Sequence, residues 1–218
     1  MNGQTVQWKI RQLGDDWRNP EAQLVGFSVD DEMQELVIPG EINGYKIRII
    51  SFEEVRGGAG LTRVVLPETA VRLEGRPFME RENPPELDVG SGHPHFKLEN
   101  GLLMSRNGEY VMCCAKEAAR MTLPSGVRVI AQRAFAGCRQ IEEIAFAGSE
   151  VSYMRIENGA FKDCTSLRRV YLPKGVELIG DYAFMGCAAL EEVEMPEGVR
   201  YMGRGVFFGC GKLEGKQA

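Results

Sequence analysis

The chain has 218 residues, of which 44% are apolar and 26% are charged, a composition typical of a globular protein. Its net charge is -5 and its Lys and Arg residues form no long run, so we expect no nucleic-acid partner. No apolar segment approaches the roughly 20 residues of a membrane span, and we expect no membrane insertion. The first residues show no signal peptide. The chain as given is therefore expected in the cytoplasm, and at the cell surface or secreted if Met1 is not the native start.

Residues 1–34 are predicted to form an N-terminal β-rich cap. Its apolar side chains are not spaced at a regular repeat, and they are those of Trp8, Ile10, Leu24, Val25 and Phe27. A solenoid needs such a cap, because the first coil otherwise exposes an apolar end and an unpaired strand edge.

Residues 35–90 begin a repeated pattern whose clearest copies lie near the C-terminus. There Phe184 recurs as Phe207 and Cys187 as Cys210, each 23 residues later. The unit reads V-x-x-I-G-x-x-A-F-x-x-C-x-x-L-x-x-V-x-L-P, and a fixed period of this length predicts a solenoid. The apolar alternation at its end predicts a short inward-facing strand that proline terminates. The A-F-x-x-C segment predicts one helical or 3₁₀ turn with Phe and Cys in the core.

The two units in residues 35–90 depart from this pattern. Gly58 and Arg81 occupy the Cys position, and Val55 occupies the first Phe position. The glycines of "GGAG" at 57–60 predict a tight turn. They do not predict a phosphate loop, because the following Lys-Ser/Thr is missing.

Residues 91–120 interrupt the repeat and predict an inserted β-meander. Two Asn-Gly pairs, at 100–101 and 107–108, lie between alternating apolar segments, and Asn-Gly favours tight hairpin turns. The insert also carries His93, His95, Cys113 and Cys114, residue types that bind zinc. Their spacing lacks the usual C-x-x-C, so we expect no metal and no other cofactor. A hydrolase or metal-dependent enzyme that uses these four residues remains the alternative.

Residues 121–218 contain the C-terminal coils, which we expect to continue one solenoid domain with those before the insert. A three-residue insertion near residue 150 lengthens one unit. Four cysteines share one repeat position, so we expect buried, reduced thiols: Cys138, Cys164, Cys187 and Cys210. Phe161 and Phe184 are expected to stack on each other in the core.

Four stretches of the sequence carry a family resemblance. They are "LPKGVELIGDYAFMGCAALEEVEMP", "LPSGVRVIAQRAFAGCRQIEEIAF", "LVIPGEINGYKIRII" and "HPHFKLENGLLMSRNGEYV". Across roughly residues 35–213 the chain resembles the BspA-type leucine-rich repeats. The resemblance implies a β-rich α/β fold, a right-handed leucine-rich-repeat solenoid with a parallel sheet. It also implies a surface or secreted adhesion or interaction protein. Gly175 and Gly198 stand where common leucine-rich repeats carry Asn, so no asparagine ladder is expected.

Two rows of residues are predicted to face outward from the strands. The first row gives a candidate partner-binding face: Val37, Val65, Thr122, Tyr171 and Glu194. The second row alternates in charge: Glu35, Arg63, Glu86, Arg120, Glu143, Arg169 and Glu192. Adjacent strands lie about 4.8 Å apart, so each Arg is expected between two carboxylates in one charge ladder across the sheet. The ladder is either structural or a recognition strip for a charged partner.

The sequence predicts a non-enzymatic interaction module that binds a protein or glycan partner through the sheet face. A solenoid presents an extended surface built from each coil. No G-x-S-x-G elbow and no other catalytic constellation occurs. Besides the enzyme already described, the other alternative is a purely structural fragment of a surface array.

Overall fold

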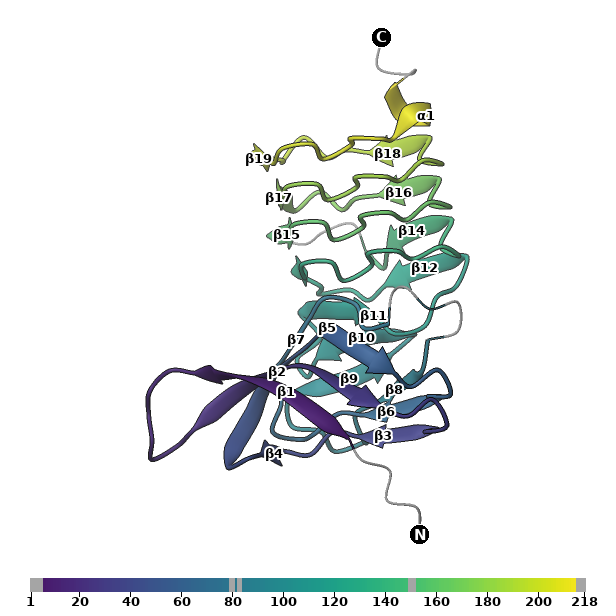
Figure 1. Cartoon of the computed structure of the whole chain (residues 1–218). Coiled ribbons are helices and arrows are strands. Elements are labelled where there is room, and N and C mark those ends of the chain that lie inside the picture. The colour runs from purple at the N-terminus through teal and green to yellow at the C-terminus, as the bar shows by residue number, and fades with distance from the viewer. Residues whose placement is uncertain (1–5, 79–80, 82–83, 149–151, 215–218) are drawn as a thin grey trace. The chain divides into compact units, whose positions relative to one another are not determined.

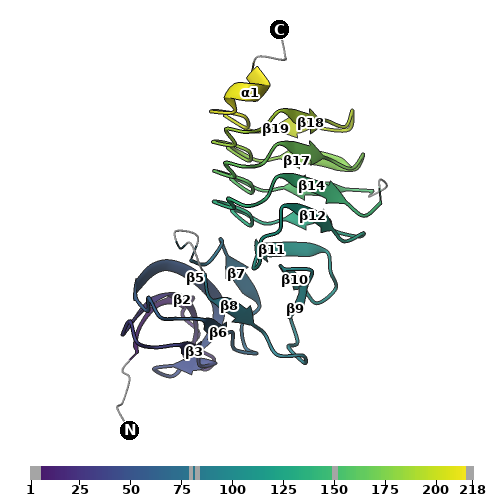
Figure 2. The same cartoon turned by 90° about the vertical axis from the view of Figure 1, so that its right-hand side faces the viewer.

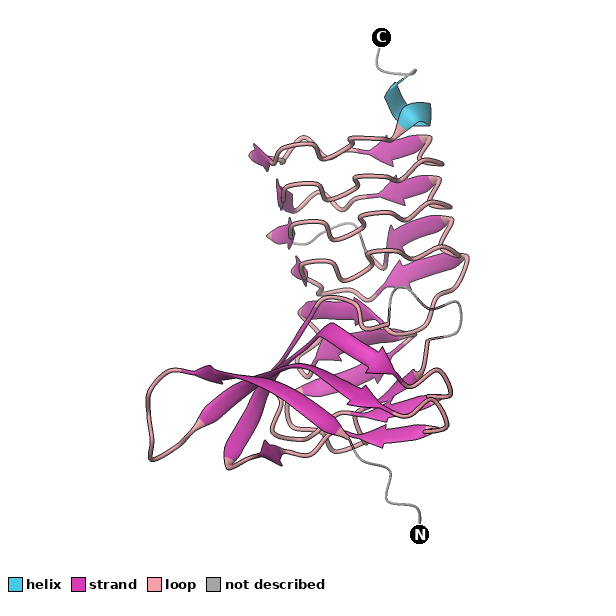
Figure 3. Ribbon diagram, in the orientation of Figure 1, coloured by secondary structure: helices cyan, strands magenta, loops and turns pink. Residues whose placement is uncertain are grey.

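The computed structural model describes residues 6–78, 81, 84–148 and 152–214. The chain divides into two compact units, Met1–Leu98 and Glu99–Ala218, and the division falls inside the predicted insert. Almost all regular structure is β, as Figure 3 shows. No helix among the described residues is both long and apolar enough to cross a membrane. The lengthened unit near residue 150 cannot be assessed at residues 149–151, which lie outside the described residues.

The N-terminal unit contains two sheets (Figure 2). Its strands are β1 (Gln7–Leu13), β2 (Glu21–Val29), β3 (Glu35–Val37), β4 (Glu41–Ile42), β5 (Tyr45–Gly57), β6 (Arg63–Val65), β7 (Arg72–Glu74) and β8 (Glu86–Asp88). One sheet has the order β1-β2-β5-β4, with β7 also paired to β5, and the other has the order β3-β6-β8. β1 and β2 come from the predicted cap. β1 pairs antiparallel with β2, and β2 pairs in parallel with β5, the long strand that follows β3 and β4.

The first unit of the repeat replaces the expected turn with strand. β5 continues through Val55 to Gly57 and pairs with β2 as far as Val29, with two shifts of register along the way. Phe52 and Val55 are residue types that favour a strand, and Gly57, with φ +69°, ends it. The glycine-rich segment then makes the predicted tight turn, in which the backbone N–H of Leu61 donates to the Gly58 carbonyl.

The next unit shows what replaces Cys at the Arg81 position. The Arg81 guanidinium donates to the carbonyl oxygens of Gly57 and Gly58, at 2.8 and 2.6 Å, and lies over the Phe78 ring. Phe78 in turn belongs to an aromatic cluster with Phe27 and Phe52. At the position where other units carry Cys, the Arg81 side chain therefore donates hydrogen bonds to two backbone carbonyl oxygens of the preceding coil.

The C-terminal unit is a regular stack of coils with a strand on each of two sides (Figure 1). The strand β9 (Phe96–Glu99) crosses the boundary between the two units, and the elements that follow it are β10 (Leu102–Ser105), β11 (Tyr110–Cys114), β12 (Arg120–Leu123), β13 (Val129–Ile130), β14 (Glu143–Phe146), β15 (Met154–Ile156), β16 (Arg169–Tyr171), β17 (Val176–Ile179), β18 (Glu192–Glu194), β19 (Tyr201–Met202) and α1 (Gly211–Glu214). One sheet has the order β19-β17-β15-β13-β11-β10-β9, and the other has the order β12-β14-β16-β18.

The predicted meander corresponds to β9, β10 and β11. β10 and β11 are antiparallel, and β11 then pairs in parallel with β13. The meander is thus the first part of the larger sheet and not an appendage on the flank of the stack. The chain folds this way because Val111 continues the inward apolar row that Ile130 and Ile156 form in the coils above it.

The expected helical or 3₁₀ turn at A-F-x-x-C is not confirmed. The segment is a run of hydrogen-bonded turns, because residues with positive φ interrupt any helix: Arg133 (56°) and Gly137 (70°) in one coil, Tyr182 (57°) and Gly186 (75°) in another. The Phe between them donates its N–H to the next coil, as Phe135 does to the Ala160 carbonyl at 2.7 Å. The backbone hydrogen bonds of these turns therefore connect neighbouring coils along a third side, in addition to the bonds within the two sheets.

The core of the C-terminal unit is a ladder of phenylalanine rings. The stacked rings are, in chain order, those of Phe135, Phe161, Phe184 and Phe207. The centroids of consecutive rings are 4.9, 4.9 and 5.6 Å apart, and their planes are within 19° of parallel. The first three are fully buried. The expectation that Phe161 and Phe184 stack in the interior is confirmed.

The repeated cysteines are buried and form no disulfide, and the same holds for Cys113 and Cys114. The thiols of Cys164, Cys187 and Cys210 each donate to the carbonyl oxygen of the Phe in the preceding coil, at 3.1 Å. Burial raises the pKa of the Cys164 thiol well above its ordinary value, which keeps it protonated as a donor. The position therefore selects a small apolar side chain that also carries a weak donor.

Candidate functional site

The predicted partner-binding face lies on two separate sheets. In the N-terminal unit Val37 pairs with Val65, and Val37 is 58% exposed. In the C-terminal unit Thr122 is exposed on β12, and Tyr171 pairs with the exposed Glu194. All five side chains lie in the outward positions of their strands, because the residues between them are inward and mostly buried.

The predicted charge ladder is divided in the same way. In the first unit the ladder residues on β3, β6 and β8 pair in register, and they are Glu35, Arg63 and Glu86. In the second unit the ladder residues on β12, β14, β16 and β18 also pair in register, and they are Arg120, Glu143, Arg169 and Glu192. β8 and β12 belong to different sheets, and among the described strands Arg120 is paired with Glu143 alone. A single ladder across one sheet was therefore the wrong expectation, because the strands that carry it pair in two different sheets.

The ion pairs follow the register only in part. Arg169 reaches Glu143 at 2.9 Å and Arg63 reaches Glu35 at 3.1 Å. On its other side Arg63 pairs with Asp88, not with Glu86, and this contact and the backbone N–H of Gly90 lower the pKa of Asp88. Asp88 lies diagonally across the strands, within reach of a long guanidinium side chain.

Replacing Arg169 with Glu would put three carboxylates in a row, at Glu143, residue 169 and Glu192. We expect a lower melting temperature of the variant at low salt. At least about half of the deficit should disappear between ~0.01 M and ~1 M salt, because the screening length falls from ~30 to ~3 Å. Thermal unfolding at both salt concentrations measures this, with Arg169→Gln as the control that removes charge without adding repulsion. Equal deficits at both salt concentrations would contradict the ladder.

A different side-chain ladder lies on the turn side of the C-terminal unit and was not predicted. The Asn158 Oδ1 accepts the backbone N–H of Asp181 at 2.9 Å, and the Asp181 Oδ1 accepts that of Arg204 at 2.8 Å. No asparagine ladder was expected at the usual repeat position, because Gly175 and Gly198 stand there in place of Asn. The signal was an Asn and an Asp 23 residues apart, directly before the positive-φ position of each turn.

Asp181 makes this ladder sensitive to acid. The backbone N–H of Arg204 lowers the pKa of the Asp181 carboxyl, aided by the Arg204 guanidinium and opposed by partial burial. A carboxyl with a lowered folded-state pKa stabilises the fold above its unfolded pKa of about 3.9. That stabilisation is lost as the pH falls through the folded-state value.

We therefore expect Asp181→Asn to flatten the acid limb of the stability profile. The amide keeps an acceptor oxygen but does not titrate, so wild type should lose its advantage over the variant as the pH falls below about 5 and through the lowered folded-state pKa of Asp181. The measurement is the difference in melting temperature at each pH, since Glu54 and Asp88 also have lowered pKa values. Asp163→Asn is the matched control. Parallel profiles for wild type and Asp181→Asn would refute the assignment.

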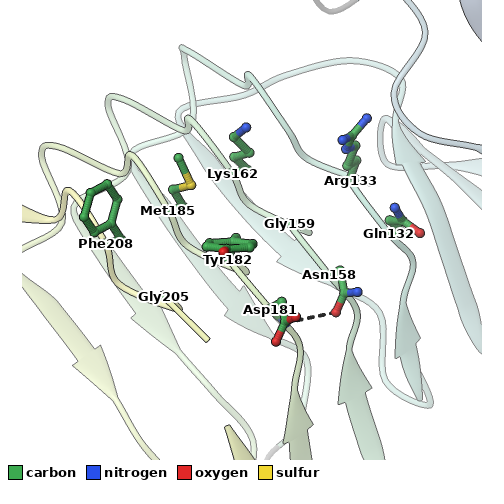
Figure 4. A pocket seen from close by; sticks show the side chains of 10 residues that line it. All are labelled: Gln132, Arg133, Asn158, Gly159, Lys162, Asp181, Tyr182, Met185, Gly205 and Phe208. Carbon is green, nitrogen blue, oxygen red and sulfur yellow. Dashed lines mark hydrogen bonds between the residues drawn. The ribbon is translucent and has the colours of Figure 1, made fainter. Parts of the chain in front are cut away.

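Beside this ladder lies an open groove of about 720 Å³ (Figure 4). It crosses four consecutive coils, and its lining residues are Gln132, Arg133, Asn158, Gly159, Lys162, Asp181, Tyr182, Met185, Gly205 and Phe208. Tyr182 is 42% exposed and Phe208 is 67% exposed, which is unusual for aromatic rings. The sequence signal for the groove was a change of residue type from coil to coil at two positions that the core pattern leaves undefined. One position carries Arg133, Gly159, Tyr182 and Gly205, and the other carries Lys162, Met185 and Phe208.

The proposed metal ligands lie in different units, His93 and His95 in the first and Cys113 and Cys114 in the second. His93 is buried, and its Nδ1 accepts the backbone N–H of His95 and Phe96 at 3.2 and 3.1 Å. Its Nε2 then carries the proton and donates to the Pro67 carbonyl at 3.0 Å. No cluster of three potential metal ligands occurs in the described part of the chain. His93 therefore holds the start of the meander through backbone contacts.

Comparison with known proteins agrees with the stacked coils. A family model described as the BspA type leucine rich repeat region matches residues 108–216 in six copies. The chain belongs to this family. No match was found among the curated proteins.

Solved structures of bacterial proteins share the fold of this BspA-type chain. A leucine-rich repeat protein from Eubacterium ventriosum aligns with a TM-score of 0.60 and 17% identity, over 97% of this chain and 77% of that one. A leucine rich cell surface protein from Faecalibacterium prausnitzii aligns with a TM-score of 0.51 and 18% identity, over 84% of this chain and 59% of that one. At these identities the likeness shows the β-rich solenoid fold alone.

Proposed function

We propose that this BspA-type chain is a non-enzymatic interaction module that binds a protein or glycan partner through the outward face of its strands. One observation carries the proposal: uncharged outward side chains on parallel strands, flanked by a row in which opposite charges neutralise each other. In the C-terminal unit the row is uncharged at Thr122, Ala145 and Tyr171, beside the Glu143–Arg169 pair, and it ends at the exposed Glu194. Val37 and Val65 form a shorter equivalent in the N-terminal unit.

The physical support is the low expected cost of binding there. Strands in a stack of coils hold their side chains in fixed rows, so little conformational entropy is lost when a partner docks. Tyr supplies a rigid amphipathic contact, a residue type enriched at binding hot spots. A row of alternating opposite charges can fix the orientation of a bound partner. Because the row has little net charge, it does not attract every partner of one sign.

A double variant, Tyr171→Ala with Thr122→Arg, tests the face. The labelled whole chain is applied to a glycan array and to an array of purified extracellular proteins. We expect the variant to lose the signals that wild type gives, by about tenfold or more in affinity. Equal binding by variant and wild type would remove this face from the proposal.

A matched control carries the same kinds of change elsewhere on the C-terminal unit. Tyr201→Ala with Thr165→Arg alters two exposed residues off this face, and it should bind as wild type does. A loss of binding in both variants would indicate a general defect of folding, which their melting temperatures would reveal.

A further inference from the structure

The groove on the turn side combines backbone strain with an exposed lining. At one repeat position four successive coils carry Arg133, Gly159, Tyr182 and Gly205, all with φ between 56° and 60°. Glycine adopts this left-handed conformation freely, whereas Arg and Tyr are strained in it. Two coils therefore keep large side chains where the other two use glycine, and both large side chains line the groove. Residues held in such conformations concentrate at binding sites.

Gly205 makes room for the Tyr182 ring, and the Arg133 side chain lies in ordinary contact distance of Gly159. A Cβ atom at Gly205 would lie 2.7 Å from the Tyr182 ring, so the ring rests directly on that glycine. A Cβ atom at Gly159 would lie 3.6 Å from the Arg133 Cγ. Each large side chain therefore lies along the groove over the next coil. The groove is a built surface and not a gap left by small residues.

The groove has a cationic end and an apolar end, which Figure 4 shows on opposite sides of Tyr182. Arg133 and Lys162 lie toward the first coils, and Met185 and Phe208 lie toward the last. No carboxylate in the described part of the chain pairs with Arg133, and Lys162 is 3.9 Å from Asp163. The one acidic lining residue, Asp181, is already bound by Arg204. The groove thus offers positive charge at one end and aromatic surface at the other.

We propose that this groove binds an extended acidic peptide segment, with a carboxylate at Arg133 and an apolar side chain against Tyr182 and Phe208. The stacked rings measure 4.9 Å from one coil to the next, so the lining spans about 15 Å over three steps. An extended peptide covers that length with about five residues. Arg is suited to hold the carboxylate in a bidentate contact.

A peptide fits this lining better than a glycan does. Met185 and Phe208 provide no hydrogen-bonding side chain at the apolar end, so sugar hydroxyl groups there would lose water without gaining a partner. An apolar peptide side chain at that end gains from burial instead. The proposal concerns a surface other than the sheet face and stands independently of it.

The test begins with a display library of random peptides of roughly eight residues, longer than the groove. The whole chain is the bait. We expect enriched sequences that place Asp or Glu about three to five residues from Phe, Trp, Leu or Met. An enriched peptide is then synthesised with a fluorescent label, and its affinity is measured by anisotropy. The same peptide with Lys in place of its acidic residues serves as the charge control and should bind at least about tenfold more weakly.

Two variants separate binding from folding. Arg133→Gly and Tyr182→Gly place at each strained position the residue that neighbouring coils already use. Glycine relieves the backbone strain of the folded state, which stabilises each variant, but it also gives the unfolded chain more conformational freedom, which destabilises it. Because these two effects oppose each other, the melting temperature should stay within about 3 °C of wild type. Each variant should weaken peptide binding by about tenfold or more. The sheet-face variant Tyr171→Ala with Thr122→Arg should bind the peptide as wild type does.

Several results would overturn the proposal. These are an absence of enriched sequences, enriched sequences without acidic residues, and equal affinity of the peptide for wild type, Arg133→Gly and Tyr182→Gly. Heparin and hyaluronan oligosaccharides provide the other test. If they bind in an Arg133-dependent way and no peptide does, the groove is a site for acidic glycans and the peptide assignment is wrong.

Discussion

Replacing Phe184 with Ala is expected to destabilise the C-terminal unit by about 3–5 kcal/mol. Phe184 is fully buried between the rings of Phe161, 4.9 Å away, and Phe207, 5.6 Å away. Its removal leaves a cavity between two coils, and the backbone bonds that fix coil spacing prevent the stack from closing it. Domains are typically stable by only about 5–15 kcal/mol, so much of the stack should unfold.

Thermal and denaturant unfolding measure the effect, with Phe208→Ala as the matched control. Phe208 is 67% exposed, so the same truncation there should change stability by less than about 0.5 kcal/mol. If Phe184→Ala melted within a degree or two of wild type, the ring ladder would not be the core of the unit.

Replacing Gly180 with Val is expected to destabilise the same unit by about 3 kcal/mol. Its φ is ordinary, so the requirement for glycine is one of space. A Cβ atom at Gly180 would lie 2.5 Å from the Asn158 Oδ1 and 2.7 Å from the Asn158 backbone nitrogen. The Asn158 side chain bonds to the Asp181 N–H and draws the two coils together at this point, so a larger residue must separate them.

The same repeat position supplies the control. Ala131 and Glu157 occupy it in the first two coils, so a Cβ atom is already accommodated at this position there. Ala131→Val should therefore cost less than about 1.5 kcal/mol. Denaturant midpoints of the two variants provide the comparison. Similar losses for Gly180→Val and Ala131→Val would show that the close approach of coils is not what selects glycine.

The repeat period and the alternation within each unit were sufficient to predict the stacked β coils, the buried Phe184 and Cys187, and the strand register. These features depend on side-chain type at regular spacing, because each coil repeats the contacts of the one before it. The same alternation placed Thr122 and Tyr171 on outward positions. Whether these residues bind a partner stays a prediction.

Other features depended on contacts that no local pattern specifies. Only the structure shows that the charge row divides between Glu86 and Arg120, since strand pairing beyond the meander decides which sheet a segment joins. Only the structure shows the left-handed conformation of Arg133 and Tyr182, which bonds from each turn to the next coil impose against the preference of those residues. The sequence by itself thus determined the stacked coils and their core. The tertiary structure decided where the stack is interrupted and which side of it forms a groove, because both depend on how neighbouring coils meet.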